Sequence, residues 1–196
     1  MNYKKYIKET YGISDIVIES PSEIPDLFNK FDDDPVLNRR EAEKIEKNDF
    51  FVGFFKNGKQ RFKIYKSVED SHIFLSVILD SQPFLILTHD IKEIKLNDKL
   101  GIESVGIWQH HHSGGFARYW MSEYILKHYD FIMSDKSHTK MGKEFWKKII
   151  WQSLDDGHEP FVYDTKNNNY EKITIDSDIT KYWGIDKSNY RLIIYK

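Results

Sequence analysis

Four kinds of segment follow one another between residues 105 and 128: an apolar run, three histidines, two glycines and an amphipathic stretch. The apolar run predicts a strand at about 102–109, and the amphipathic stretch predicts a helix at about 116–128. Gly114 and Gly115 allow the backbone to turn sharply between the two. A strand, a glycine turn and a helix N-terminus in this order can present backbone N–H groups to an anion. The sequence therefore predicts a strand-turn-helix unit with a phosphate-type site at the turn.

Composition limits what surrounds this unit. With 196 residues, of which 40% are hydrophobic and 15% aromatic, the chain is expected to form a single domain over residues 1–196. It has no cysteine, which excludes disulfides, thiolate metal ligands and a cysteine nucleophile. A net charge of −2 gives no basic excess for non-specific nucleic-acid binding, although a local basic face stays possible. No signal-peptide pattern and no membrane span is evident, so a cytoplasmic protein is expected.

The first half of the chain predicts helices and then strands. A short strand is expected at 13–18, followed by helices at 23–31 and from Asp34-Pro35 to about Lys47. Apolar runs on both sides of Asn57-Gly58 predict a hairpin of 50–55 with 60–65. Periodicity does not decide between helix and strand for the two runs that follow Tyr65, and one interpretation is a helix and then a strand, at 72–79 and 84–88.

The second half predicts alternating strands and helices. A helix capped by Ser137 or Thr139 is expected to run to about Leu154 and to stop near Gly157. A turn is predicted at 166–169. The buried or alternating patterns predict strands at 130–134, 161–163, 172–175 and 190–195.

Over residues 13–165 this order of elements resembles the GNAT superfamily of N-acetyltransferases. The segment His112-Ser113-Gly114-Gly115-Phe116-Ala117 fits that family's pyrophosphate loop, Gln/Arg-x-x-Gly-x-Gly/Ala, with His112 in the first place. A second signature, Ser134-Asp135 followed by Gly142 and Trp146, looks like an uncharacterised, largely phage-encoded branch of acetyltransferase-like proteins. The resemblance implies an α/β protein of GNAT-like acyl-CoA N-acyltransferase fold, with a mixed, mainly antiparallel sheet flanked by helices and splayed near the glycine loop.

The resemblance also implies a cofactor and candidate residues. Acetyl-CoA would be held by the six residues of the loop, His112, Ser113, Gly114, Gly115, Phe116 and Ala117. Glu103 is the family-guided general base, and a solvent-facing carboxylate at a strand end is its alternative interpretation. Where relatives carry a tyrosine that protonates the departing thiolate, this chain has Trp146, whose indole cannot deliver a proton near neutral pH. Tyr163 is an alternative acid.

The residues themselves suggest further candidates. His112 could act as a base, since the unperturbed pKa of histidine is about 6.5. If the strand continued through the histidines, His110 and His112 would share a face, and the triplet could bind a metal with Asp135 or His138. Asp135 follows a predicted strand and borders the expected ligand crevice, but capping the next helix also explains it.

The leading hypothesis is transfer of an acetyl group from coenzyme A to a primary amine on a small molecule or a protein. One alternative is a non-catalytic phage-type protein that uses the same fold to bind and block a host factor. Another is a metal-dependent or nucleobase-modifying enzyme on the same scaffold. The sequence leaves the acceptor and the oligomeric state open.

Overall fold

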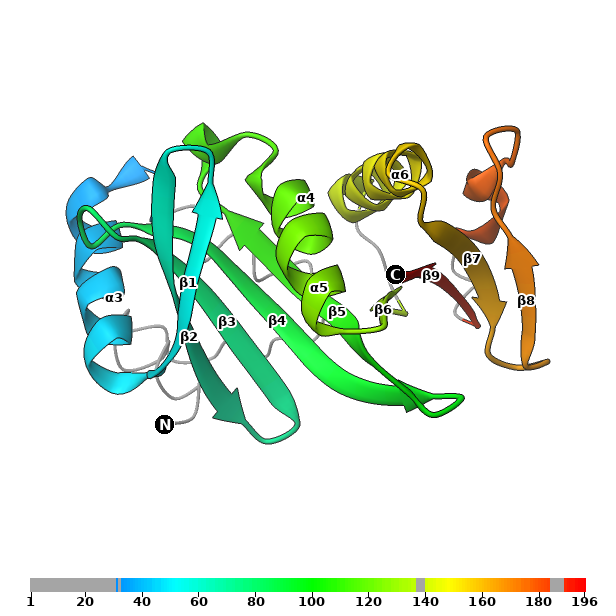
Figure 1. Cartoon of the computed structure of the whole chain (residues 1–196), viewed down its shortest axis with the longest axis horizontal. Helices are drawn as coiled ribbons and strands as arrows, with labels where there is room; N and C mark the ends of the chain where they lie inside the picture. The colour runs from blue at the N-terminus through cyan, green and yellow to red at the C-terminus, as the bar shows by residue number, and fades with distance from the viewer. Residues whose placement is uncertain (1–30, 32, 137–139, 184–188) are drawn as a thin grey trace. The chain divides into compact units, whose positions relative to one another are not determined.

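A computed structural model describes residues 31, 33–136, 140–183 and 189–196 of the chain. The described residues form an α/β structure with a mixed sheet of nine strands, hydrogen-bonded in the order β1-β2-β3-β4-β5-β6-β9-β7-β8 (Figure 1). The expectation of a mixed α/β architecture is confirmed. The strand predicted at 13–18 and the helix predicted at 23–31 lie outside the described residues, apart from Phe31.

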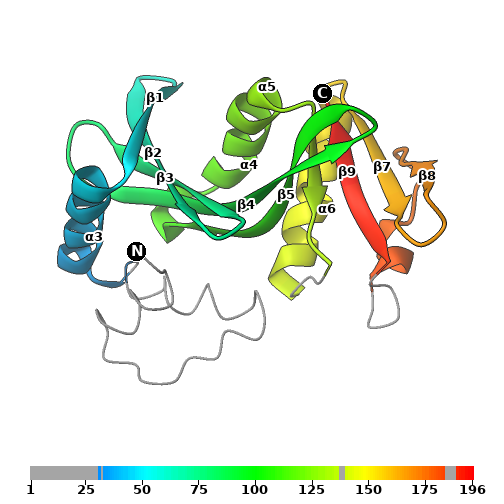
Figure 2. The same ribbon diagram turned by 90° about the horizontal axis from the view of Figure 1, so that it is seen from below.

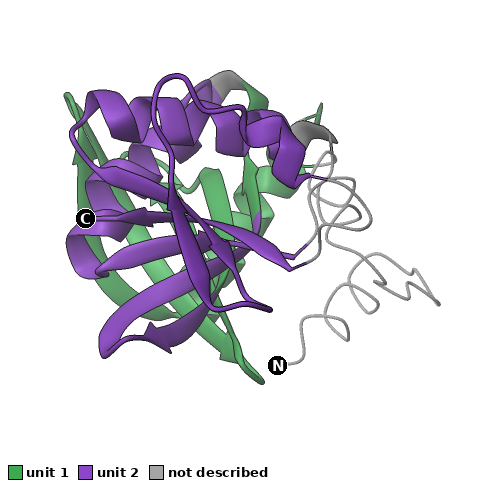
Figure 3. Cartoon of the chain, turned by 90° about the vertical axis from the view of Figure 1, so that its right-hand side faces the viewer, with its two compact units in different colours: residues 1–91, 107–112 green, residues 92–106, 113–196 purple. Residues whose placement is uncertain are grey.

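The chain divides into two compact units, coloured separately in Figure 3. Strands β4 and β5 each contribute residues to both units. Each unit is described by itself below. Unit 1 comprises residues 1–91 and 107–112, and unit 2 comprises residues 92–106 and 113–196.

Unit 1 contains helix α3 (Pro35–Asn48), which begins and ends where the sequence predicts. The Asp34 carboxylate caps it by accepting hydrogen bonds from the backbone N–H groups of Val36 and Leu37, at 2.9 and 3.1 Å. Its buried residues, Asn38, Ala42 and Ile45, recur at the spacing of one helix face. This face contributes to the core of unit 1, which consists of Phe31, Ala42, Ile45, Tyr65, Ile78, Leu85 and Trp108, with Leu37 packed against it.

The strands of unit 1 follow one another as antiparallel neighbours. The hairpin predicted across Asn57-Gly58 is confirmed, and Gly58 has the positive φ, 59°, that such a turn requires. Figures 1 and 2 show α3 beside these strands. The strands are β1 (Phe50–Asn57), β2 (Gln60–Glu69), β3 (His72–Leu79) and β4 (Leu85–Leu96).

The interpretation of 72–79 as a helix is wrong, because this segment is strand β3 and pairs with both β2 and β4. Five of its eight residues are buried, so both sides of the strand are apolar and the alternation that identifies a strand is lost. Pro83 lies in the turn that follows, where the backbone N–H of Leu79 donates to the carbonyl of Phe84 at 2.9 Å.

In unit 2 the strand order is β5-β6-β9-β7-β8. The β5–β6 pair is parallel, whereas the pairs β6–β9, β7–β9 and β7–β8 are antiparallel. Figure 1 shows β9 between β6 and β7, so the last strand of the chain enters the middle of this order. The strands are β5 (Lys99–Gln109), β6 (Phe131–Ser134), β7 (Glu159–Asp164), β8 (Asn169–Lys172) and β9 (Tyr190–Tyr195).

The helix predicted at 116–128 is confirmed, and it contains a π-helical turn. Its three parts follow without a break: α4 (Phe116–Trp120), the π-helical η3 (Met121–Ile125) and α5 (Leu126–His128). Helix α6 (Lys140–Asp155) ends before Gly157, whose φ is 82°, as the predicted glycine stop requires. Its proposed caps, Ser137 and Thr139, lie outside the described residues. The described residues also contain two short 3₁₀ helices, η2 (His111–Ser113) and η4 (Ile179–Tyr182).

Two details of unit 2 differ from the expectation. The strand predicted at 172–175 is wrong, because β8 begins directly after the turn and ends at Lys172. Beyond it, the chain bends through a turn in which the Ser177 backbone N–H donates to the Thr174 carbonyl at 3.0 Å. Residues Asn97 and Asp98, both with positive φ, make a tight turn between β4 and β5 that the sequence interpretation missed.

Burial supports the expectation that most tryptophans serve packing. Trp108, Trp120 and Trp146 are all buried. None of the helices in the described part of the chain is both long and apolar enough to cross a membrane.

Asn38 should be a strong determinant of stability in unit 1. Its fully buried amide donates to the Leu85 carbonyl at 3.0 Å and accepts from the Leu85 N–H at 2.8 Å. Replacing Asn38 with alanine removes both bonds and leaves the N–H and carbonyl of Leu85 without these partners. The free energy of unfolding should therefore fall by about 3 kcal/mol. Chemical denaturation measures this, with Asn48→Ala at the exposed end of the same helix as control. Equal losses in both variants would contradict this role.

Glu41 should make stability depend on pH. Burial, reinforced by the charge of Asp49, raises the pKa of Glu41 from 4.5 to about 7. The folded state therefore keeps this proton at pH values where the unfolded chain releases it. Stability from this residue is complete below pH 4.5 and is lost as the pH rises through about 7, by about 3 kcal/mol in all. In denaturation curves across this range, Glu41→Gln should flatten the decline, whereas Glu43→Gln, at an exposed position, should leave it unchanged.

Candidate functional site

The glycine turn has the backbone geometry that the sequence predicts. Gly115 is the N-cap of the helical segment 116–128, with φ of 77° and ψ of −4°, and no side chain caps the helix. The Gly115 carbonyl accepts the first helical bond from the Tyr119 N–H, at 3.2 Å. Phe116 and Ala117 are buried, which fixes the first turn of the helix. The positive end of the helical dipole therefore lies at the two glycines.

Arg118 adds a cation to this turn, and the sequence interpretation missed it. A Cβ atom built on Gly115 would lie 3.3 Å from Nη2 of Arg118, so the guanidinium folds back beside the glycine. Within the described residues, no carboxylate forms an ion pair with Arg118. The sequence could have indicated this contact, because Arg118 follows Gly115 by three residues and residues three apart on a helix are neighbours. A guanidinium beside a helix N-terminus is suited to a phosphate group.

The backbone of the histidines before the glycines does not continue as the strand that the alternation argument assumes. Strand β5 ends at Gln109, and His111 and His112 lie in the 3₁₀ turn η2, so alternate faces no longer apply. His110 is buried, and its ring lies edge-on to Phe84 with centroids 4.9 Å apart. The backbone N–H of His110 donates to the Ile86 carbonyl at 2.9 Å. Packing therefore accounts for His110. In the described parts of the chain, no group of three or more His, Asp or Glu side chains is placed to bind one metal ion.

Glu103 and Asp135, which are candidate residues from the sequence, converge on Arg191 in unit 2. Nε of Arg191 lies 3.9 Å from Oε1 of Glu103, and both side chains are largely buried. Burial lowers the pKa of Arg191, while the nearby charges of Glu103 and Asp135 raise it. The three residues come from β5, from the position after β6 and from β9. They form a charged cluster on one face of the sheet, which we call the Arg191 face.

Tyr163 also belongs to the Arg191 face, because it lies directly opposite Arg191 in the β7–β9 register. Its hydroxyl donates to Oδ1 of Asn168 at 3.1 Å, and its ring stacks on Tyr170 with centroids 4.6 Å apart. A proton donor at this position would first have to exchange its bond to Asn168. Trp146, at the place of the family's tyrosine, is buried and packs edge-on against Phe145 at 6.5 Å.

Ser134 has a structural explanation. Its buried Oγ accepts a hydrogen bond from the Leu192 N–H at 2.9 Å and donates to the Asp135 carbonyl at 3.3 Å, which ties the end of β6 to β9. The Asp135 side chain accepts a hydrogen bond from the N–H of Lys136. The bonds of Ser134 therefore hold the backbone from which the Asp135 carboxylate projects.

The parallel pairing of β5 with β6 is short. It runs from Gly101 opposite Phe131 to Ser104 opposite Ser134. Strand β5 continues to Gln109, and β6 stops at Ser134. In the described residues, Val105 and Gly106 therefore have no partner on β6. Among the described residues, the pairing of β5 with β6 therefore ends at Ser104.

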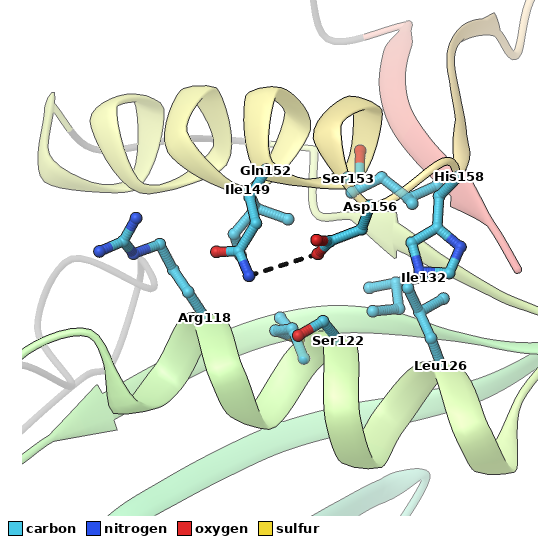
Figure 4. Close-up of a pocket in the computed structure, with 11 residues that line it drawn as sticks. Arg118, Ser122, Leu126, Ile132, Ile149, Gln152, Ser153, Asp156 and His158 are labelled. Carbon is cyan, nitrogen blue, oxygen red and sulfur yellow. Dashed lines mark hydrogen bonds between the residues drawn. The ribbon is translucent and has the colours of Figure 1, made fainter.

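A small groove lies between the helical segment 116–128 and α6 (Figure 4). In Figure 4, Arg118 and Ser122 rise from one helix toward Gln152 and Asp156 on the other. Gln152 Nε2 donates to Asp156 Oδ2 at 3.4 Å. The other residues that line the groove are mostly apolar: Met121, Leu126, Ile132, Ile149, Ser153, His158 and Ile194. Arg118 thus borders both the groove and the glycine turn.

Comparison with known proteins adds no relative. No family model matches the chain, and no curated protein and no solved structure matches it either.

The two glycines of the turn should differ in their tolerance of alanine. At Gly115 the positive φ strains any side chain, and a Cβ would press on the Arg118 guanidinium. At Gly114 a Cβ would meet open space. Gly115→Ala should therefore lower the free energy of unfolding by about 1–2 kcal/mol, whereas Gly114→Ala should leave it nearly unchanged. Thermal and chemical denaturation of the two variants test this difference, and a larger loss at Gly114 would refute the turn geometry.

Proposed function

We propose that the protein transfers an acyl group, most simply acetyl, from coenzyme A to a primary amine. The observation that carries this proposal is the early end of the β5–β6 pairing at Ser104, upstream of the positive-φ glycine turn at Gly115. Beyond Ser104 the described residues of β5 and β6 no longer pair, which supports the GNAT-like splay that the sequence resemblance implies.

The glycine turn fits the anionic end of coenzyme A. A pyrophosphate needs positive potential and a backbone without bulky side chains. The helix N-terminus and Arg118 supply the positive potential. Gly114 and Gly115 supply the backbone without bulky side chains. In the proposed complex, the turn from His112 to Ala117 holds the pyrophosphate, and Arg118 is added to the set that the sequence suggested. The groove beside Arg118 gives the bound coenzyme an adjoining apolar surface.

The Arg191 face supplies the proton acceptor in this proposal. Coenzyme A contributes an activated acyl group as a thioester. The acceptor amine must lose a proton as its nitrogen bonds to the acyl carbon and the carbon–sulfur bond breaks. Glu103 is the base that takes this proton, and Asp135 adds negative charge that favours a cationic amine. Tyr163 is the phenol on the same face that can return a proton to the sulfur.

Calorimetry with acetyl-CoA tests the proposal without knowledge of the acceptor. The wild-type protein should bind acetyl-CoA with a dissociation constant of about micromolar order. Arg118→Gln removes one charge-assisted contact and should weaken binding about ten- to a hundredfold. Arg39→Gln makes the same change at an exposed position of α3 and should have no effect.

Two outcomes of this experiment would count against the proposal. Absence of heat with the wild-type protein at high concentration would exclude coenzyme A as a substrate. Equal binding by the Arg118 and Arg39 variants would exclude Arg118 from the binding turn.

A further inference from the structure

Arg191 is an unusual residue to find inside unit 2. Its side chain is only 5% exposed, in strand β9 between two antiparallel neighbours. Removing a guanidinium from water is costly, and the presence of Glu103 and Asp135 offsets that cost. Apolar residues of similar volume often stabilise such a position as well as a buried ion pair does. Stability alone therefore does not account for a cation here.

The guanidinium of Arg191 is anchored by a backbone carbonyl of its own strand. Nη1 of Arg191 donates to the Tyr190 carbonyl at 2.9 Å, which fixes one end of the planar group. Its Nε then faces Oε1 of Glu103 at 3.9 Å. A planar cation with one end anchored restricts where a neighbouring carboxylate can lie.

Register explains why these charges meet. Glu103 pairs with Met133 across β5–β6, and Met133 pairs with Ile193 across β6–β9. Asp135 lies two residues beyond Met133, and Arg191 lies two residues before Ile193, so all share one face of the sheet. The facing residue on β7 is Tyr163. The titratable groups of this face nearest to Arg191 are therefore Glu103, Asp135 and Tyr163. The register places further titratable groups on the same face: Lys99 of β5, Glu159 of β7, Tyr170 and Lys172 of β8, and Tyr195 of β9.

We propose that Arg191 is a positioning residue for acyl transfer: it sets the orientation of the Glu103 carboxylate, with Asp135 as the second carboxylate that balances its charge. This inference rests on the proposed function. Arg191 itself touches neither substrate nor reacting atoms. It acts through Glu103, which takes the proton.

The test measures turnover of acetyl-CoA by release of the free thiol. Hydrolysis is followed first, because water then replaces the unidentified amine, and spermidine is added as a probe acceptor. Arg191→Gln removes the guanidinium and should lower kcat about tenfold or more while the affinity for acetyl-CoA stays unchanged. Arg191→Lys keeps the charge but not the planar fork. It should therefore also leave kcat about tenfold or more below wild type.

Arg61→Gln is the matched control. Arg61 is also paired with a carboxylate, Asp80, at 2.6 Å, but it is half-exposed and belongs to unit 1. Replacing Arg61 should leave kcat unchanged. Circular dichroism and acetyl-CoA calorimetry establish that each variant is folded and binds the coenzyme. If Arg191→Gln does not fold, the kcat of Arg191→Lys, at unchanged coenzyme affinity, decides the question.

The outcomes separate this inference from the proposed function. If wild-type protein does not bind acetyl-CoA, the proposed function fails and the role of Arg191 fails with it. If wild-type protein binds acetyl-CoA but shows no turnover with water or spermidine, the assignment of base chemistry to this face is refuted. If turnover occurs and the Arg191 variants lose stability without a change in kcat, Arg191 is structural and the acyltransferase proposal stands.

Discussion

The short parallel pairing of β5 with β6 is the constraint on which the rest of unit 2 depends. Parallel neighbours cannot be joined by a tight turn, so the chain must leave β5, cross one face of the sheet as a helix and return at Phe131. The crossing begins at Gly115, whose positive φ turns the backbone into the helix. Since β6 has only four residues, β5 extends beyond it. The glycine turn and the early end of the β5–β6 pairing are thus two results of one connection.

Much of the local structure could be predicted because its signals are local. Asn57-Gly58 sets a hairpin, Asp34-Pro35 starts a helix and Gly157 stops one through backbone preferences that act within a few residues. The error at 72–79 has the opposite origin. A strand that is apolar on both sides carries no alternation, so only its pairing with β2 and β4 distinguishes it from a buried helix.

The candidate site could be predicted only in part, for the same reason. Glu103, Asp135 and Tyr163 were identified singly from their positions near strand ends. Their common partner, Arg191, is 88 residues beyond Glu103 in the chain, and only the insertion of β9 between β6 and β7 brings it to them. No local pattern encodes that strand order. For the histidine triplet, the sequence suggested a shared strand face that the structure does not have, because strand β5 ends at Gln109.

The π-helical turn has a consequence for the groove. Successive residues of an α-helix are about 100° apart around its axis, so residues eight apart, such as Arg118 and Leu126, would normally differ by about 80°. A π-helical turn absorbs one additional residue, which reduces this difference to about 20° in the opposite sense. Arg118 and Leu126 consequently line the same groove. The insertion of one residue into a helical turn thus brings both side chains to the side of the helix that faces α6.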